Sequence, residues 1–200
     1  MKYNQTQNWF QVSEIKANIE QHVNVNKPHK ILEIGCFEGI STCFFSDVLL
    51  NHNDSELHCV DPFIHTHSSA AKKLGITTQC IDYKTKQTFQ QNIYKSKWYT
   101  KIKFFNITSH DFMRSNNKIM YDIIYIDGCH EPDYLEHDVV ECFNILNDGG
   151  IMWMDDYMGN TTNDGKCCIH IDRALEQFSG LYDVIHKNYQ LAIKKHNNNT

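Results

Sequence analysis

Five short apolar segments, separated by segments of helical character, are the feature of this sequence that most limits its fold. Continuous apolar runs of this kind are typical of strands buried on both faces of a parallel sheet. The five segments are residues 30–36 (KILEIGC), 55–61 (SELHCVD), 101–107 (KIKFFNI), 121–127 (YDIIYID) and 150–156 (GIMWMDD). Their alternation with helices predicts an α/β fold in which helices cover the sheet on both sides.

The intervening segments have the periodicity of amphipathic helices. Apolar residues lie on roughly one side of residues 39–50 and recur at spacings of four and three in residues 132–146. Pro132 suits the first position of this second helix, and the run NDGG at residues 147–150 is expected to end it. Further helices are expected at residues 7–25, 84–95 and 171–178, and the part of 65–99 before residue 84 is looser.

The last two strand-like segments, residues 181–187 and 189–195, are almost contiguous. A parallel crossover needs about a dozen residues, so these segments must form an antiparallel hairpin. We therefore predict a single α/β domain, residues 1–200, with a doubly wound seven-stranded sheet that is mostly parallel and ends in a C-terminal antiparallel hairpin. Residues 1–28 are expected to form an N-terminal helical extension, and residues 196–200 a frayed tail.

Composition excludes several classes of protein. The net charge of −5 argues against a broad nucleic-acid-binding face, although a local basic patch stays open around KSKWYTKIK, residues 95–103. No apolar run approaches the ~18–20 residues that span a bilayer, and the polar start has no signal core, so a cytoplasmic protein is expected. The eight cysteines are scattered without paired CxxC motifs, which indicates free, mostly buried thiols.

Acids and glycines gather at the carboxyl ends of four of the expected strands. Ligands of open α/β sheets bind beyond these ends, so the rim that they form is the expected binding site. The residues are Glu33, Gly35 and Gly39 in EIGCFEG, Asp61 in CVDPF, Asp127 in YIDGCH, and Asp155 and Asp156 in WMDD.

The glycine pattern argues against a dinucleotide or a nucleoside triphosphate. The glycines follow G-x-x-x-G rather than G-x-G-x-x-G, and the phosphate loop GxxxxGK[ST] is absent. Glu38 would place a carboxylate where the helix N-terminus should attract a phosphate. A cationic ligand without phosphate, such as S-adenosylmethionine, suits the acidic rim better, and Asp61 is placed to accept hydrogen bonds from two ribose hydroxyls.

Four motifs in the order ILEIGCFEG, CVDPF, YDIIYIDGCH and NDGGIMWMDD resemble those of class I S-adenosylmethionine-dependent methyltransferases. The resemblance covers residues 31–195 and implies the Rossmann-like fold of that family, with the terminal hairpin as its sixth and seventh strands. It implies that S-adenosylmethionine binds to Glu33, Gly35, Cys36, Gly39, Ser41, Asp61, Pro62 and Asp127.

IDGCH followed by GGIMWMDD resembles, more narrowly, the metal-dependent O-methyltransferases of the macrocin (macrolide-sugar) type. This resemblance implies that Asp127, Asp155 and Asp156 hold Mg²⁺ or another divalent cation. It assigns His130 as general base, with Asp127 as a second catalytic residue. Hard cations prefer carboxylate oxygen, and a bound cation lowers the pKa of a hydroxyl whose proton a histidine can then accept. The implied acceptor is a hydroxyl of a small molecule, a sugar or a glycan.

The acceptor does not carry over further, because the macrolide enzymes are longer and have an additional N-terminal domain. The segment 62–100 is the expected lid or acceptor wall. His65, His67 and Asp164 are candidate acceptor contacts near the mouth of the site. Trp153, Phe104 and Phe105 are expected in the core, with packing on adenine as their alternative role.

Plainer roles stay open for the same residues. Asp127 could be a turn or cap residue, His130 could lie in solvent at the start of the next helix, and one of the two aspartates after the fifth strand could point away. Glu33 lies within a strand, where a buried charge needs a partner. Two other functions also stay open, namely a metal-independent methyltransferase acting on a catechol, a protein or a nucleic acid, and a non-catalytic cofactor-binding subunit. A homodimer is an open assembly state.

Overall fold

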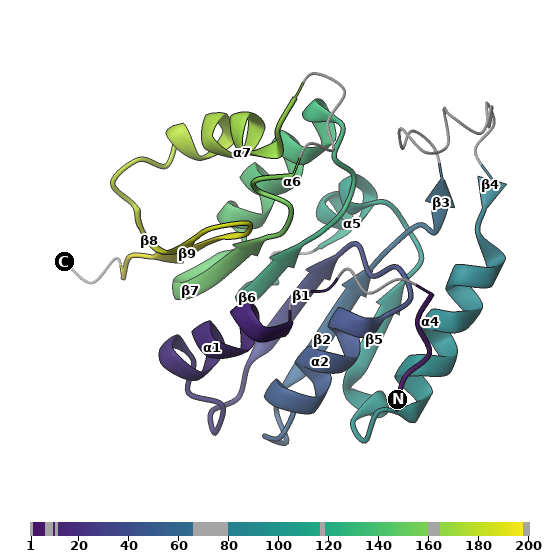
Figure 1. Ribbon diagram of the computed structural model, residues 1–200. Coiled ribbons are helices and arrows are strands. Elements are labelled where there is room, and N and C mark those ends of the chain that lie inside the picture. Colours follow the sequence, from purple (N-terminus) through teal and green to yellow (C-terminus); the bar gives the residue numbers. More distant parts are fainter. Residues whose placement is uncertain are drawn as a thin grey trace.

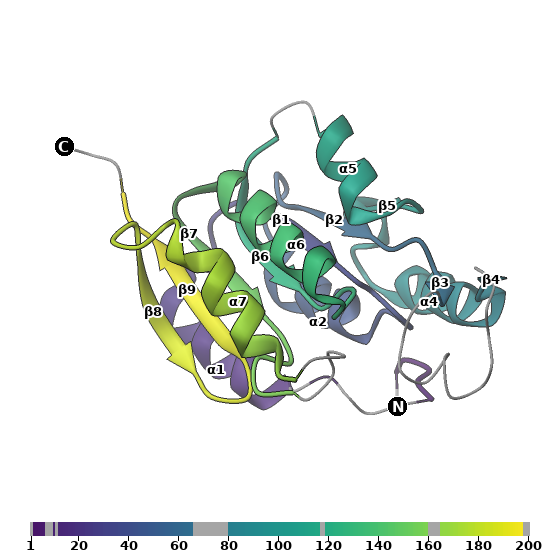
Figure 2. The same cartoon turned by 90° about the horizontal axis from the view of Figure 1, so that it is seen from above.

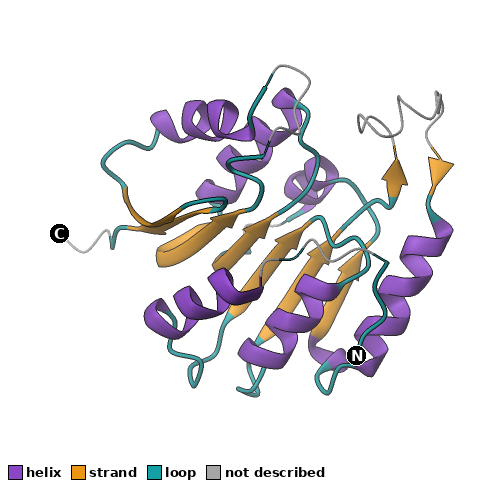
Figure 3. Ribbon diagram, in the orientation of Figure 1, coloured by secondary structure: helices purple, strands orange, loops and turns teal. Residues whose placement is uncertain are grey.

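The computed structural model describes residues 2–6, 10, 12–65, 80–116, 119–159 and 165–197. Its main sheet has seven strands in the order β5-β2-β1-β6-β7-β9-β8, drawn in orange in Figure 3. These strands are β1 (Lys30–Ile34), β2 (Glu56–Val60), β5 (Ile102–Phe105), β6 (Tyr121–Ile126), β7 (Leu146–Met154), β8 (Tyr182–Lys187) and β9 (Leu191–Lys195). The first five are parallel, whereas β9 is antiparallel to β7 and β8. The mostly parallel sheet with a terminal antiparallel hairpin is therefore confirmed.

Helices cover both faces of the sheet, as the buried strands require (Figure 1). One face carries α1 (Val12–His22), α2 (Ile40–Leu49) and α4 (Tyr83–Lys95), and the other carries α5 (Ser109–Ser115), α6 (Pro132–Asn144) and α7 (Cys167–Glu176). A 3-10 turn, η1 (Tyr99–Lys101), precedes β5, and β3 (Ile64–His65) pairs with β4 (Cys80–Ile81) outside the main sheet. Seen from above, β8 and β5 lie at opposite ends of the main sheet (Figure 2).

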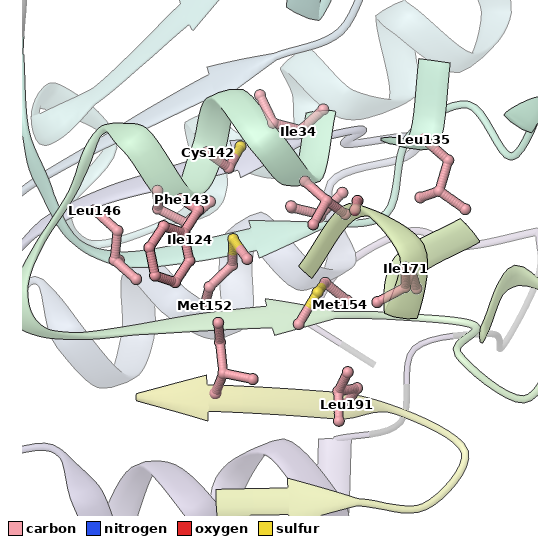
Figure 4. Close-up of a cluster of buried hydrophobic side chains, with 14 of the residues drawn as sticks. Ile34, Ile124, Leu135, Cys142, Phe143, Leu146, Met152, Met154, Ile171 and Leu191 are labelled. Atoms are coloured by element: carbon pink, nitrogen blue, oxygen red, sulfur yellow. The ribbon is translucent and has the colours of Figure 1, made fainter. Parts of the chain in front are cut away.

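The strands alternate their side chains between two apolar layers. In β1, Leu32 and Ile34 pack in the layer under α6 and α7, shown in Figure 4, while Ile31 lies in the layer under α1 and α2. Glu33 has the same parity as Ile31, so its carboxyl group enters this second layer, beside Tyr125 of β6. This alternation explains why Glu33 is buried. Trp153 is buried as expected, and Phe104 and Phe105 are partly buried against the two layers.

Three sequence expectations need correction. The helix expected at 132–146 ends at Asn144, and the NDGG run lies inside β7, where the pairing with β6 is irregular and Gly149 has a φ of 73°. The helix expected at 171–178 is α7, which begins earlier, at Cys167. The buried side chain of Cys167 extends the apolar face of this helix toward its N-terminus. Helix α5 was not expected, and its N-cap is Thr108, whose hydroxyl accepts from the backbone N–H of Asp111 at 3.1 Å.

Other expectations agree with the structure of the described residues. The helix expected at 7–25 is present as α1, Val12–His22, and the one expected at 84–95 is α4. The cysteines for which a state is described are free, and most of them are buried. In the described ranges, no helix has the length and apolar character needed to cross a membrane.

Candidate functional site

The register of the sheet brings four loops to one edge. Ile34 at the end of β1 pairs with Val60 of β2 and with Ile126 of β6, and Ile126 pairs with Met154 of β7. The loops that follow these strands therefore begin side by side along one edge of the sheet. The acids and glycines that the sequence places after separate strands share a single rim.

Gly35 allows the loop after β1 to lie directly against the end of β6. Its φ is 82°, and a Cβ at this position would lie 2.0 Å from the carbonyl oxygen of Asp127. Gly39, the N-cap of α2, has a φ of 79°, and a Cβ there would lie 2.8 Å from Cδ2 of Phe89. Cys36 turns its thiol into the core, so this loop presents backbone at the rim. A loop with this shape allows a ligand to approach its backbone closely.

Asp61, after β2, holds the glycine loop. Its Oδ2 accepts from the backbone N–H groups of Cys36 at 2.8 Å and Phe37 at 3.0 Å, and its Oδ1 accepts from Phe63 at 2.6 Å. Pro62 is fixed beside it through its carbonyl, which accepts from the Asn106 side chain at 3.0 Å. A carboxylate has about four lone-pair sites, so Asp61 can hold the loop and also accept from a ligand.

Glu33 lies at the bottom of the same loop and is fully buried. Its carboxylate accepts hydrogen bonds from the hydroxyls of Ser41 and Thr42 in the first turn of α2, and from the thiol of Cys59 at 3.5 Å. Burial raises the pKa of Glu33 to about 7, although these hydrogen bonds lower it in part. The expected partner for a charge within the strand is thus present. Glu33 and Ser41 as direct cofactor contacts stay predictions, since here they bond to each other.

Asp127, His130 and Asp156 converge at the rim. Nε2 of His130 lies 3.9 Å from Oδ1 of Asp127 and 3.5 Å from Oδ2 of Asp156. This nitrogen is buried and makes no hydrogen bond to any described residue. The Asp127 side chain is 36% exposed, yet burial of its carboxyl group, followed by the charges of Asp155 and Asp156, raises its pKa well above the usual value. This group of three side chains is called the rim triad below.

Asp155 has a different environment from its neighbour Asp156. It is 9% exposed, and its Oδ2 accepts from the hydroxyl of Tyr125. Its Oδ1 accepts from the side chain of Gln190 at 2.8 Å and from the backbone N–H of Asp156 at 2.7 Å. Burial raises the pKa of Asp155, and the bonds from Tyr125 and Gln190 oppose this shift. Asp155 as a metal ligand stays a prediction, because its oxygens already accept from protein donors.

The turn between β8 and β9 supplies two residues that the sequence reasoning missed. The hydroxyl of Tyr189 donates to Oδ1 of Asp156, and Gln190 is fully buried between Asp155 and the indole N–H of Trp153, from which it accepts at 2.9 Å. The hairpin was predicted, but its turn was treated only as a connection. A tyrosine and a glutamine in a turn next to the acid-bearing strand were the available signal.

Glu38 of the glycine loop meets the N-terminal segment. It is 3% exposed, and its carboxylate accepts from the backbone N–H of Thr6 at 2.6 Å and from the Thr6 hydroxyl at 2.9 Å. Asn92 of α4 adds a bond to the Glu38 carbonyl at 2.8 Å and exchanges hydrogen bonds with the backbone of Asn4. Glu38 is therefore a structural anchor in this loop.

The rim triad is a group of side chains that could hold a divalent cation. Its ligand atoms lie within 4.8 Å of one another, and they comprise two carboxylates and one imidazole. The His130 nitrogen without a hydrogen-bond partner and the crowded carboxylates are features that a cation would relieve. Of the metal ligands expected from sequence, Asp127 and Asp156 belong to this triad and Asp155 lies behind it.

The acceptor-side expectations fall largely outside the described residues. His67 and Asp164 are not among them, and for His65, the last residue of β3, the side chain is not described.

Comparison with known proteins gives one family and many structures. The family described as "Methyltransferase domain" matches residues 32–157. No curated protein matches the chain. Among solved structures, cofactor-bound Rv0187 from MTB is similar with a TM-score of 0.68 and 10% identity, covering 98% of this chain and 84% of that one.

Two further structures are similar over most of the chain. The O-methyltransferase NovP gives a TM-score of 0.68 and 14% identity, over 92% of this chain and 79% of that one. The O-methyltransferase TomG from Streptomyces achromogenes, in complex with SAM, gives 0.60 and 13% over 92% and 80%. At these identities the likeness establishes the fold.

Proposed function

Because the chain belongs to this methyltransferase family, we propose that it transfers the methyl group of S-adenosylmethionine to a hydroxyl of a small molecule, a sugar or a glycan. The observation that carries the proposal is the convergence of Asp127, His130 and Asp156 beside the glycine loop. Structural neighbours named as O-methyltransferases, one of them in complex with SAM, support the choice of donor and of a hydroxyl acceptor.

The proposed cofactor-binding site is formed by the glycine loop, residues 35–39, and Asp61. The loop offers backbone to a ligand, and three backbone N–H groups fix Asp61, so its remaining accepting capacity can serve a ribose hydroxyl without reorientation. A negative rim suits a ligand that carries a sulfonium and an ammonium group and no phosphate. Asp127, whose carbonyl lies against Gly35, would then be the acid nearest to the sulfonium end of the cofactor.

His130 is the proposed general base. Its Nε2 makes no hydrogen bond within the described residues, so in the tautomer with the proton on Nδ1 no described protein donor uses the Nε2 lone pair. The positive charge that the ring gains lies next to the carboxylates of Asp127 and Asp156. The deprotonated oxygen then attacks the methyl carbon in line with the departing sulfur, and positioning of the two reactants supplies much of the rate.

A divalent cation such as Mg²⁺ is part of the proposal, with Asp127 and Asp156 as its ligands and Asp155 as the carboxylate that orders Asp156 through a backbone bond. A bound cation would lower the pKa of the acceptor hydroxyl. His130 is close enough to the same carboxylates to serve as a third ligand, so its two roles need to be separated by experiment.

The cofactor test is calorimetry with S-adenosylmethionine. Asp61→Ala should weaken binding at least tenfold, about 1.4 kcal/mol, because it removes the ribose acceptor and loosens the loop. Asp54→Ala, an exposed acid before β2, is the matched control and should bind as the wild type does. Unchanged affinity of Asp61→Ala would contradict the placement of the cofactor.

The reaction test is an acceptor screen with and without chelator. Methylation of a hydroxyl acceptor should fall on chelation, return with Mg²⁺, and be lost in His130→Ala. Activity that is insensitive to both changes would favour a metal-independent enzyme acting on another acceptor. Tight cofactor binding without turnover over a broad screen would instead favour a non-catalytic binding subunit.

A further inference from the structure

A pair of histidines on the α5/α6 side of the sheet lies outside the rim. Nδ1 of His110, near the start of α5, is 3.1 Å from Nε2 of His137 in α6, and the two ring centroids are 4.7 Å apart. His110 is exposed and the side chain of His137 is about one-third exposed, so both rings are open to solvent. The helices that carry them lie next to each other (Figure 1).

The separation of the two nitrogens is that of neighbouring ligands on one metal ion. Metal–nitrogen distances of about 2.0–2.1 Å place two adjacent ligand nitrogens roughly 3–3.4 Å apart. Without an ion, one of the two rings must donate an N–H hydrogen bond to the other. With an ion, both rings can present lone pairs to the same point.

A buried carboxylate stands behind this pair. Asp138 follows His137 in α6 and is only 2% exposed, and its Oδ1 finds no hydrogen-bond partner among the described residues. The same oxygen lies 3.7 Å from Nδ1 of His137, on the side of the ring away from His110. A histidine that ligates a metal through one nitrogen commonly donates its other N–H to a carboxylate. A small rotation of the ring would satisfy Asp138 and fix the tautomer that leaves Nε2 free to ligate.

We propose that His110 and His137 form a surface site for a first-row transition ion of the Zn²⁺ or Ni²⁺ type, with Asp138 as the carboxylate that orients His137. Imidazole nitrogen suits such ions, whereas the carboxylates of the rim triad suit a hard cation. The two sites should thus differ in selectivity. The proposal is independent of methyl transfer, because neither histidine belongs to the rim.

Calorimetric titration of the full chain with ZnCl₂ tests the site. The wild type should bind one equivalent more than His110→Ala and than His137→Ala, while Mg²⁺ should not compete for that equivalent. His196→Ala is the matched control, since His196 is also exposed and has a carboxylate 3.2 Å away, and no contact with a second histidine is found for it among the described residues. His130→Ala, which alters the rim triad, should retain the equivalent.

Equal stoichiometry and affinity in the wild type, His110→Ala and His137→Ala would overturn the site. Ring-proton NMR gives a second measurement: Zn²⁺ should shift the resonances of His110 and His137 together, and shifts confined to other histidines would overturn it as well. Asp138→Asn should weaken Zn²⁺ binding about tenfold. Unchanged affinity in that variant would remove Asp138 from the proposal.

Discussion

Asp155 and Asp156 are adjacent in sequence but differ in burial, in backbone conformation and in the direction in which the carboxylate points. Asp155 is buried, and both of its oxygens accept from protein donors. Asp156 has a φ of 51°, unusual for a residue other than glycine, and it turns its carboxylate out toward His130. The first supports the loop and the second faces His130. Motifs that contain two acids therefore do not imply two equivalent ligands.

The same division separates Glu33 from Asp127. Glu33 is enclosed by hydroxyls and a thiol, whereas Asp127 is partly exposed and lies beside a histidine nitrogen that has no hydrogen-bond partner in the described chain. The inner acids, Glu33 and Asp155, should govern stability. The outer acids, Asp127 and Asp156, should govern activity. Each of the following variants tests one side of this division.

The largest expected effect belongs to the outer group. His130→Ala should lower kcat by about 10²–10⁴-fold, the usual contribution of a general base, and Asp156→Asn should lower it to a similar degree. The melting temperature should change little, since the His130 nitrogen makes no hydrogen bond to lose. Steady-state kinetics and thermal melts measure the two quantities. Loss of activity accompanied by an equally large loss of stability would place these residues with the inner group.

Asp155→Ala should have its main effect on stability. It leaves the buried Gln190 amide without its acceptor, and it leaves the Tyr125 hydroxyl with only the long bond of 3.4 Å to Oδ2 of Asp127. An unsatisfied buried group costs about 1–3 kcal/mol, so the free energy of unfolding should fall by about that amount for the Gln190 amide alone, and the weaker bond of Tyr125 should lower it further. Denaturant titration measures this, with the exposed Asp54→Ala as control. If the variant were as stable as the wild type, the hydrogen bonds of Asp155 would only offset the cost of its burial and its repulsion by Asp156, with no net contribution to stability.

Sequence reasoning reached the rim but not this division, and the reason is physical. Strand ends are readable because apolar runs stop at glycines and acids, and parallel strands bring those stops to one edge. Whether Asp155 or Asp156 faces a ligand depends on a positive φ at Asp156 and on partners more than thirty residues away, Tyr189 and Gln190. No local pattern encodes such partners.

Glu33 shows the limit from the other side. Its position within a strand signalled that a partner was needed, and period-two alternation indicates that it shares a face with Ile31. The identity of the partners follows only from the packing of α2, which places Ser41 and Thr42 over the strand. The NDGG run misled for a related reason: a sheet can absorb turn residues as an irregularity at a strand's start.

Glu33→Gln should change how stability depends on pH. The pKa of Glu33 is raised to about 7 in the folded protein, so the folded state holds its proton more tightly than the unfolded state does. Its contribution to the free energy of unfolding is therefore fully present below its ordinary pKa and is lost as pH rises through about 7. Glutamine does not titrate, so the variant should gain relative to the wild type across this window, by up to roughly 3 kcal/mol.

Denaturant titration of both proteins at pH 5 and pH 8 measures this gain. Glu20→Gln is the matched control, because Glu20 lies on the exposed side of α1. The control and the wild type should lose or gain stability in parallel. If the free energy of unfolding of Glu33→Gln also followed that of the wild type between pH 5 and pH 8, folding would not raise the pKa of Glu33. The group would then be ionised in both the folded and the unfolded state over this range.

Tyr189→Phe should give the smallest effect. It tests whether the hairpin turn contributes to activity together with the outer acids. Tyr189 lies on the hairpin turn, is 40% exposed, and touches the rim through its hydroxyl bond to Asp156. Its backbone carbonyl, which accepts from Met158 at 3.0 Å, is untouched by the substitution, so the turn should stay in place. One hydrogen bond contributes about 0.5–1.5 kcal/mol, which corresponds to a fall in kcat of roughly two- to twelvefold.

The kinetic parameter that changes decides the role of Tyr189. If its hydroxyl only orients Asp156, kcat should fall while KM for S-adenosylmethionine and the melting temperature stay close to wild type. Tyr99→Phe, at another exposed tyrosine far from the rim loops in sequence, should leave all three unchanged. Because Asp156 would keep its strained backbone without the bond that fixes its side chain, a normal kcat in Tyr189→Phe would show that the φ of Asp156 alone aims its carboxylate. The hairpin would then be scaffold, and the outer group would end at Asp156.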